Sequence, residues 1–142
     1  MPAQRPFNRI TPRLGERVFI DPACTVIGDV HIGEDSSIWP GTIIRGDVNH
    51  IRIGARTNIQ DGSIIHVSHD GPSGKPVGYP TLIGDDVTIG HGAIIHACRI
   101  GNAHRIAAQR GWGTQSTDVH TAGRECFEQL FLGHLRRLDV GQ

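Results

Sequence analysis

The chain has few aromatic residues and little that would mark a membrane or nucleic-acid-binding protein. Aromatic side chains make up 5% of its 142 residues. No apolar run approaches the ~18 residues that cross a membrane. Basic and acidic residues number 14 each, so the formal net charge is zero. We therefore expect neither nucleic acid nor a membrane as a partner.

Cysteine is also scarce. The three cysteines, Cys24, Cys98 and Cys126, have neither the even number nor the close spacing of a disulfide framework or a zinc knuckle. The segment from Met1 to Arg17 has prolines and arginines but lacks the apolar centre of a signal peptide. These features predict reduced thiols and a cytoplasmic location.

What the sequence does contain is glycine, at 19 positions, and an aliphatic residue that recurs every six positions. The recurring residues are Val26, Ile32, Ile38, Ile44, Ile53, Ile59, Ile65, Ile83, Ile89 and Ile95. Such a repeat predicts coils of three very short strands, each strand followed by a turn that glycine permits. The expected fold is all-β, a parallel β-helix in which successive coils lie ~4.8 Å apart.

Three segments fall outside this repeat. Residues 1–24 contain four prolines and are expected to cover the open edge of the first coil. Residues 69–80 hold three glycines and three prolines and are expected to form an excursion loop. The period ends at about residue 102, which predicts a β-helix domain over 1–102 and a non-repetitive tail over 103–142. Apolar residues between Glu125 and Leu138 predict an amphipathic C-terminal α-helix in this tail.

Removing the excursion loop aligns two histidines. His66 and His96 are 30 residues apart, and without the twelve loop residues their separation is 18, which is one complete coil. We therefore expect their side chains to stack on one wall of the β-helix. The same subtraction places Asp61 beneath His91.

His66, His91 and His96 form a candidate metal-binding set. Three imidazoles that leave a fourth position for water are the ligands of a catalytic zinc site. His91 precedes His96 by five residues and faces away from the other two, so it would complete a site on an adjacent subunit. This arrangement predicts a cyclic trimer. The alternative is that these are ordinary surface histidines, since the chain has nine histidines.

Several sequence blocks resemble the gamma-class carbonic anhydrase family of left-handed β-helix proteins. The blocks are Ile44–Asp47, Asn58–Gly62, His66 and Gly90–His96, in that order. The resemblance implies a left-handed β-helix and a homotrimer that catalyses the reversible hydration of carbon dioxide. It also implies zinc, or Fe²⁺ or Co²⁺ in its place, with His66 and His96 as ligands from one subunit and His91 from its neighbour.

The resemblance implies roles for four further residues. Gln60 matches the residue that hydrogen-bonds the metal-bound water or bicarbonate. Arg45 and Asp47 match an ion pair that supports the subunit contact and the substrate end of the site. Asp61 matches a supporting carboxylate.

The sequence departs from the family pattern at the proton-transfer residues and in the tail. Val48 follows Asp47 where well-characterised members carry a glutamate, and the excursion loop offers His69, Asp70 and Tyr79 in place of a shuttle glutamate. A general base contributes about 10²–10⁴-fold to the rate, so weak turnover is expected. The period also ends about two coils early, as in a short natural variant or a truncated or frame-shifted chain.

The sequence is therefore also compatible with two other functions. One is a metal-binding structural homologue with little or no turnover. The other is a hexapeptide-repeat acyltransferase, which would hold acyl-CoA between subunits and use one catalytic histidine. The metal-like set of histidines and the missing late coils favour the carbonic anhydrase-like protein over the acyltransferase.

Overall fold

The computed structural model describes residues 3–69 and 78–106, which form thirteen short strands. The strands are β1 (Gln4–Arg5), β2 (Arg13–Leu14), β3 (Phe19–Ile20), β4 (Thr25–Ile32), β5 (Ser37–Ile38), β6 (Ile43–Ile53), β7 (Asn58–Ile59), β8 (Ile64–His66), β9 (Thr81–Ile83), β10 (Thr88–Ile89), β11 (Ile94–His96), β12 (Arg99–Ile100) and β13 (Arg105–Ile106). None of the described residues belongs to a helix that is long and apolar enough to cross a membrane.

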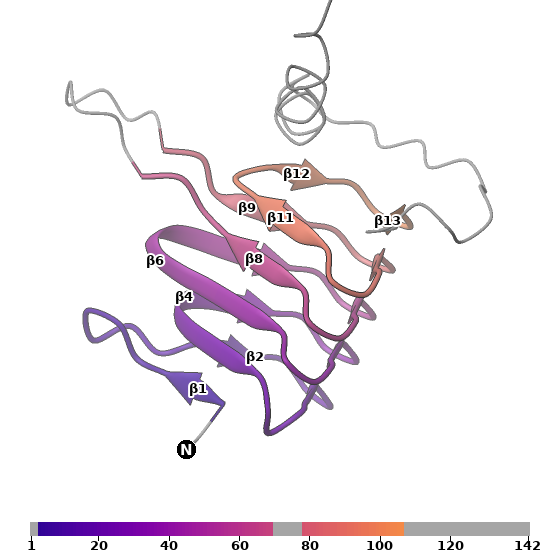
Figure 1. Ribbon diagram of the computed structural model, residues 1–142, viewed down its shortest axis with the longest axis horizontal. Coiled ribbons are helices and arrows are strands. Elements are labelled where there is room, and N and C mark those ends of the chain that lie inside the picture. Colours follow the sequence, from indigo (N-terminus) through magenta and orange to yellow (C-terminus); the bar gives the residue numbers. More distant parts are fainter. Residues whose placement is uncertain (1–2, 70–77, 107–142) are drawn as a thin grey trace, which may run out of the picture.

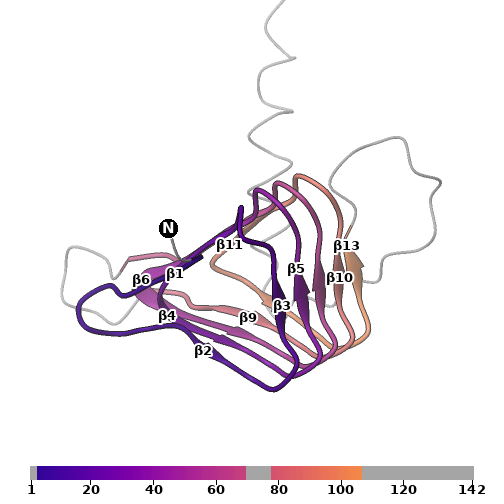
Figure 2. The ribbon, with the colours of Figure 1, turned by 90° about the horizontal axis from the view of Figure 1, so that it is seen from below.

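The strands wind as five coils around three walls (Figures 1 and 2). The first wall consists of β1, the first halves of β4 and β6, β8 and β11. The second consists of β2, the second halves of β4 and β6, β9 and β12. The third consists of β3, β5, β7, β10 and β13. All these strands pair in parallel, because each lies one coil above its partner.

The repeat positions point inward. The ten aliphatic residues predicted from the six-residue period are all buried, none more than 5% exposed. Burying a side chain of this size contributes about 1.5–3 kcal/mol to the free energy of unfolding. These ten buried residues are therefore a main source of stability. The predicted all-β parallel β-helix is thus confirmed over the described residues, whereas the predicted helix at 125–138 lies outside them.

The β-helix is longer at both ends than the sequence predicts. Residues 1–24 were expected to serve as a cover, but β1, β2 and β3 form a complete coil. Leu14 and Ile20 pack against the core and extend the six-residue spacing back from Val26. At the other end, β13 pairs with β10 beyond residue 102, and Ile106 packs against the core six residues after Ile100.

Strands β4 and β6 bend around the corner between the first and second walls. The register passes from Gly28↔Gly46 to Val30↔Ile51, so β6 carries three extra residues at this corner. The bend brings the backbones into close contact, because a Cβ on Gly28 would lie 2.2 Å from the carbonyl oxygen of Gly46. Asp47 is one of the residues at this bend, and its side chain contacts His66 at the end of β8.

The corner between the second and third walls carries a ladder of alternating charges. Arg17, Asp35, Arg56 and Asp86 occupy equivalent positions in successive coils, all with φ between 52° and 57°. Arg17 donates two hydrogen bonds to Asp35, at 2.6 and 2.8 Å, and Arg56 donates two to Asp86, at 2.7 and 2.8 Å. These hydrogen bonds from the arginines lower the pKa of both carboxyl groups.

The ladder predicts a loss of stability in acid. Because the folded pKa values lie below the unfolded ones, the carboxylates stabilise the fold above about pH 4, and this contribution disappears as the pH falls through the folded values. We expect the double variant Asp35→Asn/Asp86→Asn to melt a few degrees lower at pH 7 and to converge with the unsubstituted protein below about pH 3. Both groups are exposed, so 1 M salt is expected to shrink the difference at pH 7. A difference that persists in acid would contradict the ladder's electrostatic role.

Candidate metal site

His66 and His96 lie one above the other at the ends of β8 and β11. The two residues are paired in the parallel register of the first wall, which confirms the stack obtained by removing the excursion loop. Their ring centroids are 5.3 Å apart with a tilt of 49°. Both side chains therefore emerge at the same corner, close enough for their nitrogens to approach a shared ligand.

Asp47 connects this pair to Arg45. One carboxylate oxygen of Asp47 lies 2.9 Å from Nε2 of His66, and the other accepts a hydrogen bond from the Arg45 guanidinium. Partial burial raises the pKa of Asp47, but the hydrogen bonds from His66, the Val48 amide and Arg45 outweigh it, so the net pKa is lowered. Asp47 is therefore ionised at neutral pH and holds the His66 ring in place.

The environment of His96 keeps its imidazole neutral. Partial burial and the neighbouring His66 lower the pKa of His96, against a backbone hydrogen bond at Val67 that raises it. A neutral imidazole has a free lone pair, which is the form that binds metal ions. His96 thus offers a nitrogen ligand without a proton that must first be removed.

His91 lies at the opposite corner of the first wall, in the turn between β10 and β11. Its Nδ1 lies 3.0 Å from Oδ2 of Asp61, which occupies the equivalent turn one coil below, as the loop-free alignment predicts. Gln60 precedes Asp61 and is half-buried, with its backbone N–H bonded to the carbonyl oxygen of Ile89. A carboxylate beside a histidine is the arrangement that orients metal-binding imidazoles in proteins.

The structure thus gathers the predicted site residues into two groups within one chain. Arg45, Asp47, His66 and His96 share one corner, and Gln60, Asp61 and His91 share the other. Over residues 3–69 and 78–106, no group of three or more histidine, cysteine or acidic side chains could hold a metal ion within a single chain. A three-histidine site would therefore need both corners, brought together from two chains.

The face between the two corners is apolar. Ile43, Ile64 and Ile94 are paired in register on consecutive coils of the first wall. Their exposed fractions are 41%, 41% and 52%, which is unusual for isoleucine. A contact with another chain through this stripe would remove apolar surface from water.

Thr81 supports the histidine corner, although its place in the sequence pattern does not mark it as a site residue. It is fully buried as the first residue of β9. Its hydroxyl donates to the carbonyl oxygen of His66 at 2.5 Å and accepts from the Ala97 N–H at 3.0 Å. Thr81 pairs with the buried Ile51, so it is a polar residue at an inward position. A threonine at such a position is the sequence signal that points to a buried hydrogen bond.

Replacing Thr81 with valine is expected to loosen this corner. The change removes two buried hydrogen bonds and should lower the free energy of unfolding by about 1–3 kcal/mol. Thr57→Val is the matched control, because the buried Thr57 hydroxyl bonds the Gly84 carbonyl at 2.9 Å away from the histidines. We expect both variants to lose stability in denaturant titrations but only Thr81→Val to shift the imidazole NMR signals of His66 and His96. Equal shifts in both variants would contradict this role.

The donor set fits a catalytic metal ion. Two stacked imidazoles, of which His96 is held neutral and His66 is held by Asp47, resemble the histidine and carboxylate pairings of zinc proteins. A third imidazole from a neighbouring chain would complete a set of three nitrogen ligands. Iron(II) and cobalt(II) accept the same ligands.

The chain is similar to several known proteins. Residues 11–46 match the family model of the bacterial transferase hexapeptide, six repeats. The chain is 53% identical over 98 residues to Protein YrdA of Escherichia coli, covering 69% of this chain. It is 52% identical over 89 residues to Gamma carbonic anhydrase 1, mitochondrial, of Arabidopsis thaliana, covering 63% of this chain.

A solved structure shares the fold. The crystal structure of a hexapeptide transferase family protein from Anaplasma phagocytophilum superposes with a TM-score of 0.63 at 40% identity, covering 72% of this chain and 55% of that one. This chain spans only part of its relatives, 53% of the Escherichia coli protein and 32% of the Arabidopsis protein.

Proposed function

We propose, because this chain belongs to the gamma-class carbonic anhydrase family, that it catalyses the reversible hydration of carbon dioxide to bicarbonate. The reaction takes place at a metal ion bound between two subunits of a homotrimer. The observation that carries the proposal is the in-register stack of His66 and His96 at one corner, with His91 at the other.

The apolar stripe of Ile43, Ile64 and Ile94 supports the subunit contact. It lies between the two corners, so chains that cover it with one another bring His91 of one chain towards His66 and His96 of the next. A closed ring of three such contacts creates three equivalent sites. Sedimentation of the full chain is expected to give a trimer.

Each residue of the two corners has a chemical role in this proposal. Asp47 holds the His66 ring, and Asp61 holds that of His91. A bound zinc, iron or cobalt ion supplies the Lewis acid that makes water nucleophilic near neutral pH. The Gln60 amide hydrogen-bonds an oxygen of the substrate, and the positive charge of Arg45 attracts bicarbonate.

Metal analysis tests the binding half of the proposal. Protein purified without a histidine tag is expected to contain about one ion per chain, since three chains share three sites. Fewer than about one ion per three chains would count against the site. Stopped-flow assays after loading with zinc, or with iron under anaerobic conditions, then measure hydration of carbon dioxide. We expect His96→Ala to abolish it and His104→Ala, outside both corners, to leave it unchanged.

A metal-binding structural homologue is the second candidate. Val48 favours it, because it is 41% exposed at the position where a glutamate would serve proton transfer. This candidate predicts metal in the trimer and a hydration rate equal to that of buffer, unaffected by His96→Ala. An acyltransferase would instead bind acyl-CoA, which calorimetry detects directly.

A further inference from the structure

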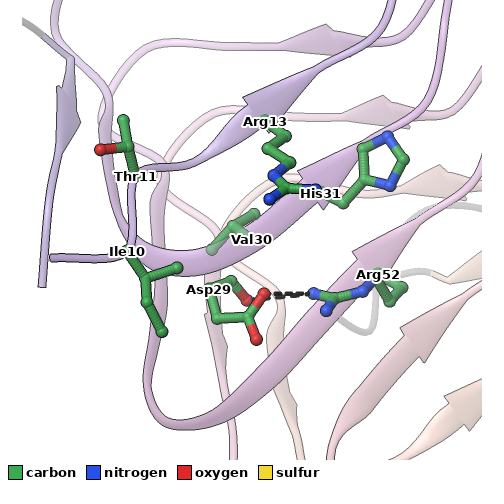
Figure 3. A pocket seen from close by; sticks show the side chains of 7 residues that line it. All are labelled: Ile10, Thr11, Arg13, Asp29, Val30, His31 and Arg52. Atoms are coloured by element: carbon green, nitrogen blue, oxygen red, sulfur yellow. Dashed lines mark hydrogen bonds and ion pairs between the residues drawn. The ribbon is translucent and has the colours of Figure 1, made fainter. Parts of the chain in front are cut away.

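A cleft opens on the second wall, and none of the candidate metal ligands lines it. It has a volume of about 320 Å³ and lies where β2, β4 and β6 run side by side (Figure 3). The residues that matter for its chemistry are Arg13, Asp29, His31 and Arg52, with Ile10 and Thr11 at one side. We refer to these six residues as the basic cleft.

The parallel register stacks three basic side chains in this cleft. Arg13 pairs with His31, and His31 pairs with Arg52, so they occupy the same position on three consecutive strands. Neighbouring strands lie ~4.8 Å apart, so two guanidinium groups lie on either side of one imidazole on this face. A negative group placed against this stack is attracted by both arginines.

The cleft itself supplies only part of that negative charge. Arg52 donates to Oδ1 of Asp29 at 2.7 Å and to the carbonyl oxygens of Asp29 and Ile51. Within residues 3–69 and 78–106, the side chains of Arg13 and His31 form no hydrogen bond or ion pair. The cleft therefore carries a net positive charge and has N–H donors that are open to a ligand.

These groups suit a phosphate group attached to a small organic molecule. A guanidinium presents parallel N–H donors that match phosphate oxygens, and an imidazole adds another donor. Ile10 and the Thr11 hydroxyl offer contacts for a short carbon chain with hydroxyl groups, and Asp29 can accept from such a hydroxyl. The volume of the cleft admits a molecule of this size.

We propose that the basic cleft is a binding site for a small phosphate monoester, held between Arg13, His31 and Arg52. The site lies on a different wall from the apolar stripe and uses none of the candidate metal ligands. Its occupancy can therefore be measured on the full chain whether or not the protein binds metal or hydrates carbon dioxide.

Isothermal titration calorimetry at constant ionic strength tests the proposal. The probes are glycerol 3-phosphate, inorganic phosphate and acetate. We expect glycerol 3-phosphate to bind more tightly than inorganic phosphate, and acetate to bind at least tenfold more weakly than either. Equal affinities for acetate and phosphate, or no heat from the phosphates beyond that of sodium chloride, would overturn the proposal.

Substitutions locate the site. Arg13→Gln is expected to weaken glycerol 3-phosphate binding by tenfold or more, because it removes a charged donor. Arg99→Gln is the matched control, since Arg99 belongs to the same column of the second wall but is separated from Arg52 by Leu82. We expect it to change the affinity less than twofold. Equal losses in the two variants would show binding to the general charge of the wall and would overturn the site.

Asp29→Asn gives a test that damage to the fold cannot imitate. Asparagine keeps an oxygen for Arg52 but removes the negative charge that faces the phosphate. We therefore expect tighter binding of glycerol 3-phosphate. The check on folding is a melting temperature lowered by no more than a few degrees, the effect of losing one partly exposed ion pair. Weaker binding in a variant that is stably folded would contradict the proposed position of the phosphate.

Discussion

A one-to-one mixture of His91→Ala and His96→Ala chains, assembled together, is expected to recover about one quarter of the metal sites, whereas each variant alone binds almost none. Each proposed site takes His66 and His96 from one chain and His91 from the next. A site is intact only when a His91→Ala chain supplies the first pair and a His96→Ala chain supplies the third ligand. With equal and random mixing, one site in four meets this condition.

Metal content and hydration rate of the coexpressed, purified mixture measure this recovery together. A mixture of His66→Ala and His96→Ala chains is the control, because both residues belong to the same half of the site and no pairing restores it. Recovery in the control would show that the histidines do not divide between chains as proposed. No recovery in the first mixture, with trimers present, would remove His91 from the site.

Gly33→Ala is expected to destabilise the β-helix by about 3 kcal/mol. A Cβ at position 33 would lie 2.5 Å from the Ala55 nitrogen and the Gly54 carbonyl carbon, and 2.7 Å from the Gly54 oxygen. These are backbone atoms of the next coil, so no side chain can rotate to make room. The two coils would have to separate, which would break the parallel hydrogen bonds around this corner, including that from the Gly33 N–H to Ile53.

Gly62→Ala separates this steric effect from conformational strain. Gly62 has φ of 69°, but a Cβ there would meet no atom within 4 Å. The left-handed conformation alone costs about 1–2 kcal/mol for alanine. In denaturant titrations we expect Gly33→Ala to lose clearly more stability than Gly62→Ala, with a melting temperature lower by roughly 15 °C than that of the unsubstituted protein. The opposite order would mean that successive coils adapt to an inserted methyl group.

The six-residue period predicts the fold well because one constraint acts at every coil. Each coil has to place an aliphatic side chain in a narrow interior, so the spacing of Val26, Ile32 and Ile38 already determines the walls. The register follows from the same spacing once the excursion loop is set aside, which is why the pairing of His66 with His96 could be predicted.

Features that depend on the backbone at corners were not accessible from the sequence. The hydrogen bond between Asp47 and His66 lies at the bend where β6 carries three extra residues, and the six-residue repeat does not predict the backbone path of such a bend. Thr81 was missed because the six-residue period marks Ile83 and says nothing about the position two residues before it. The first coil was missed because its few inward residues are separated by prolines and arginines.

Hydrogen bonds join the segments of one coil, ending in β8 and beginning with β9, that flank residues 70–77. The Ser68 N–H bonds the Tyr79 carbonyl oxygen at 3.1 Å, and Thr81 joins the His66 and Ala97 backbones directly behind it. Ser68 and Tyr79 are therefore held next to each other by the backbone. This junction is a natural point for grafting a foreign peptide or an affinity epitope, displayed beside the histidine corner by a rigid scaffold.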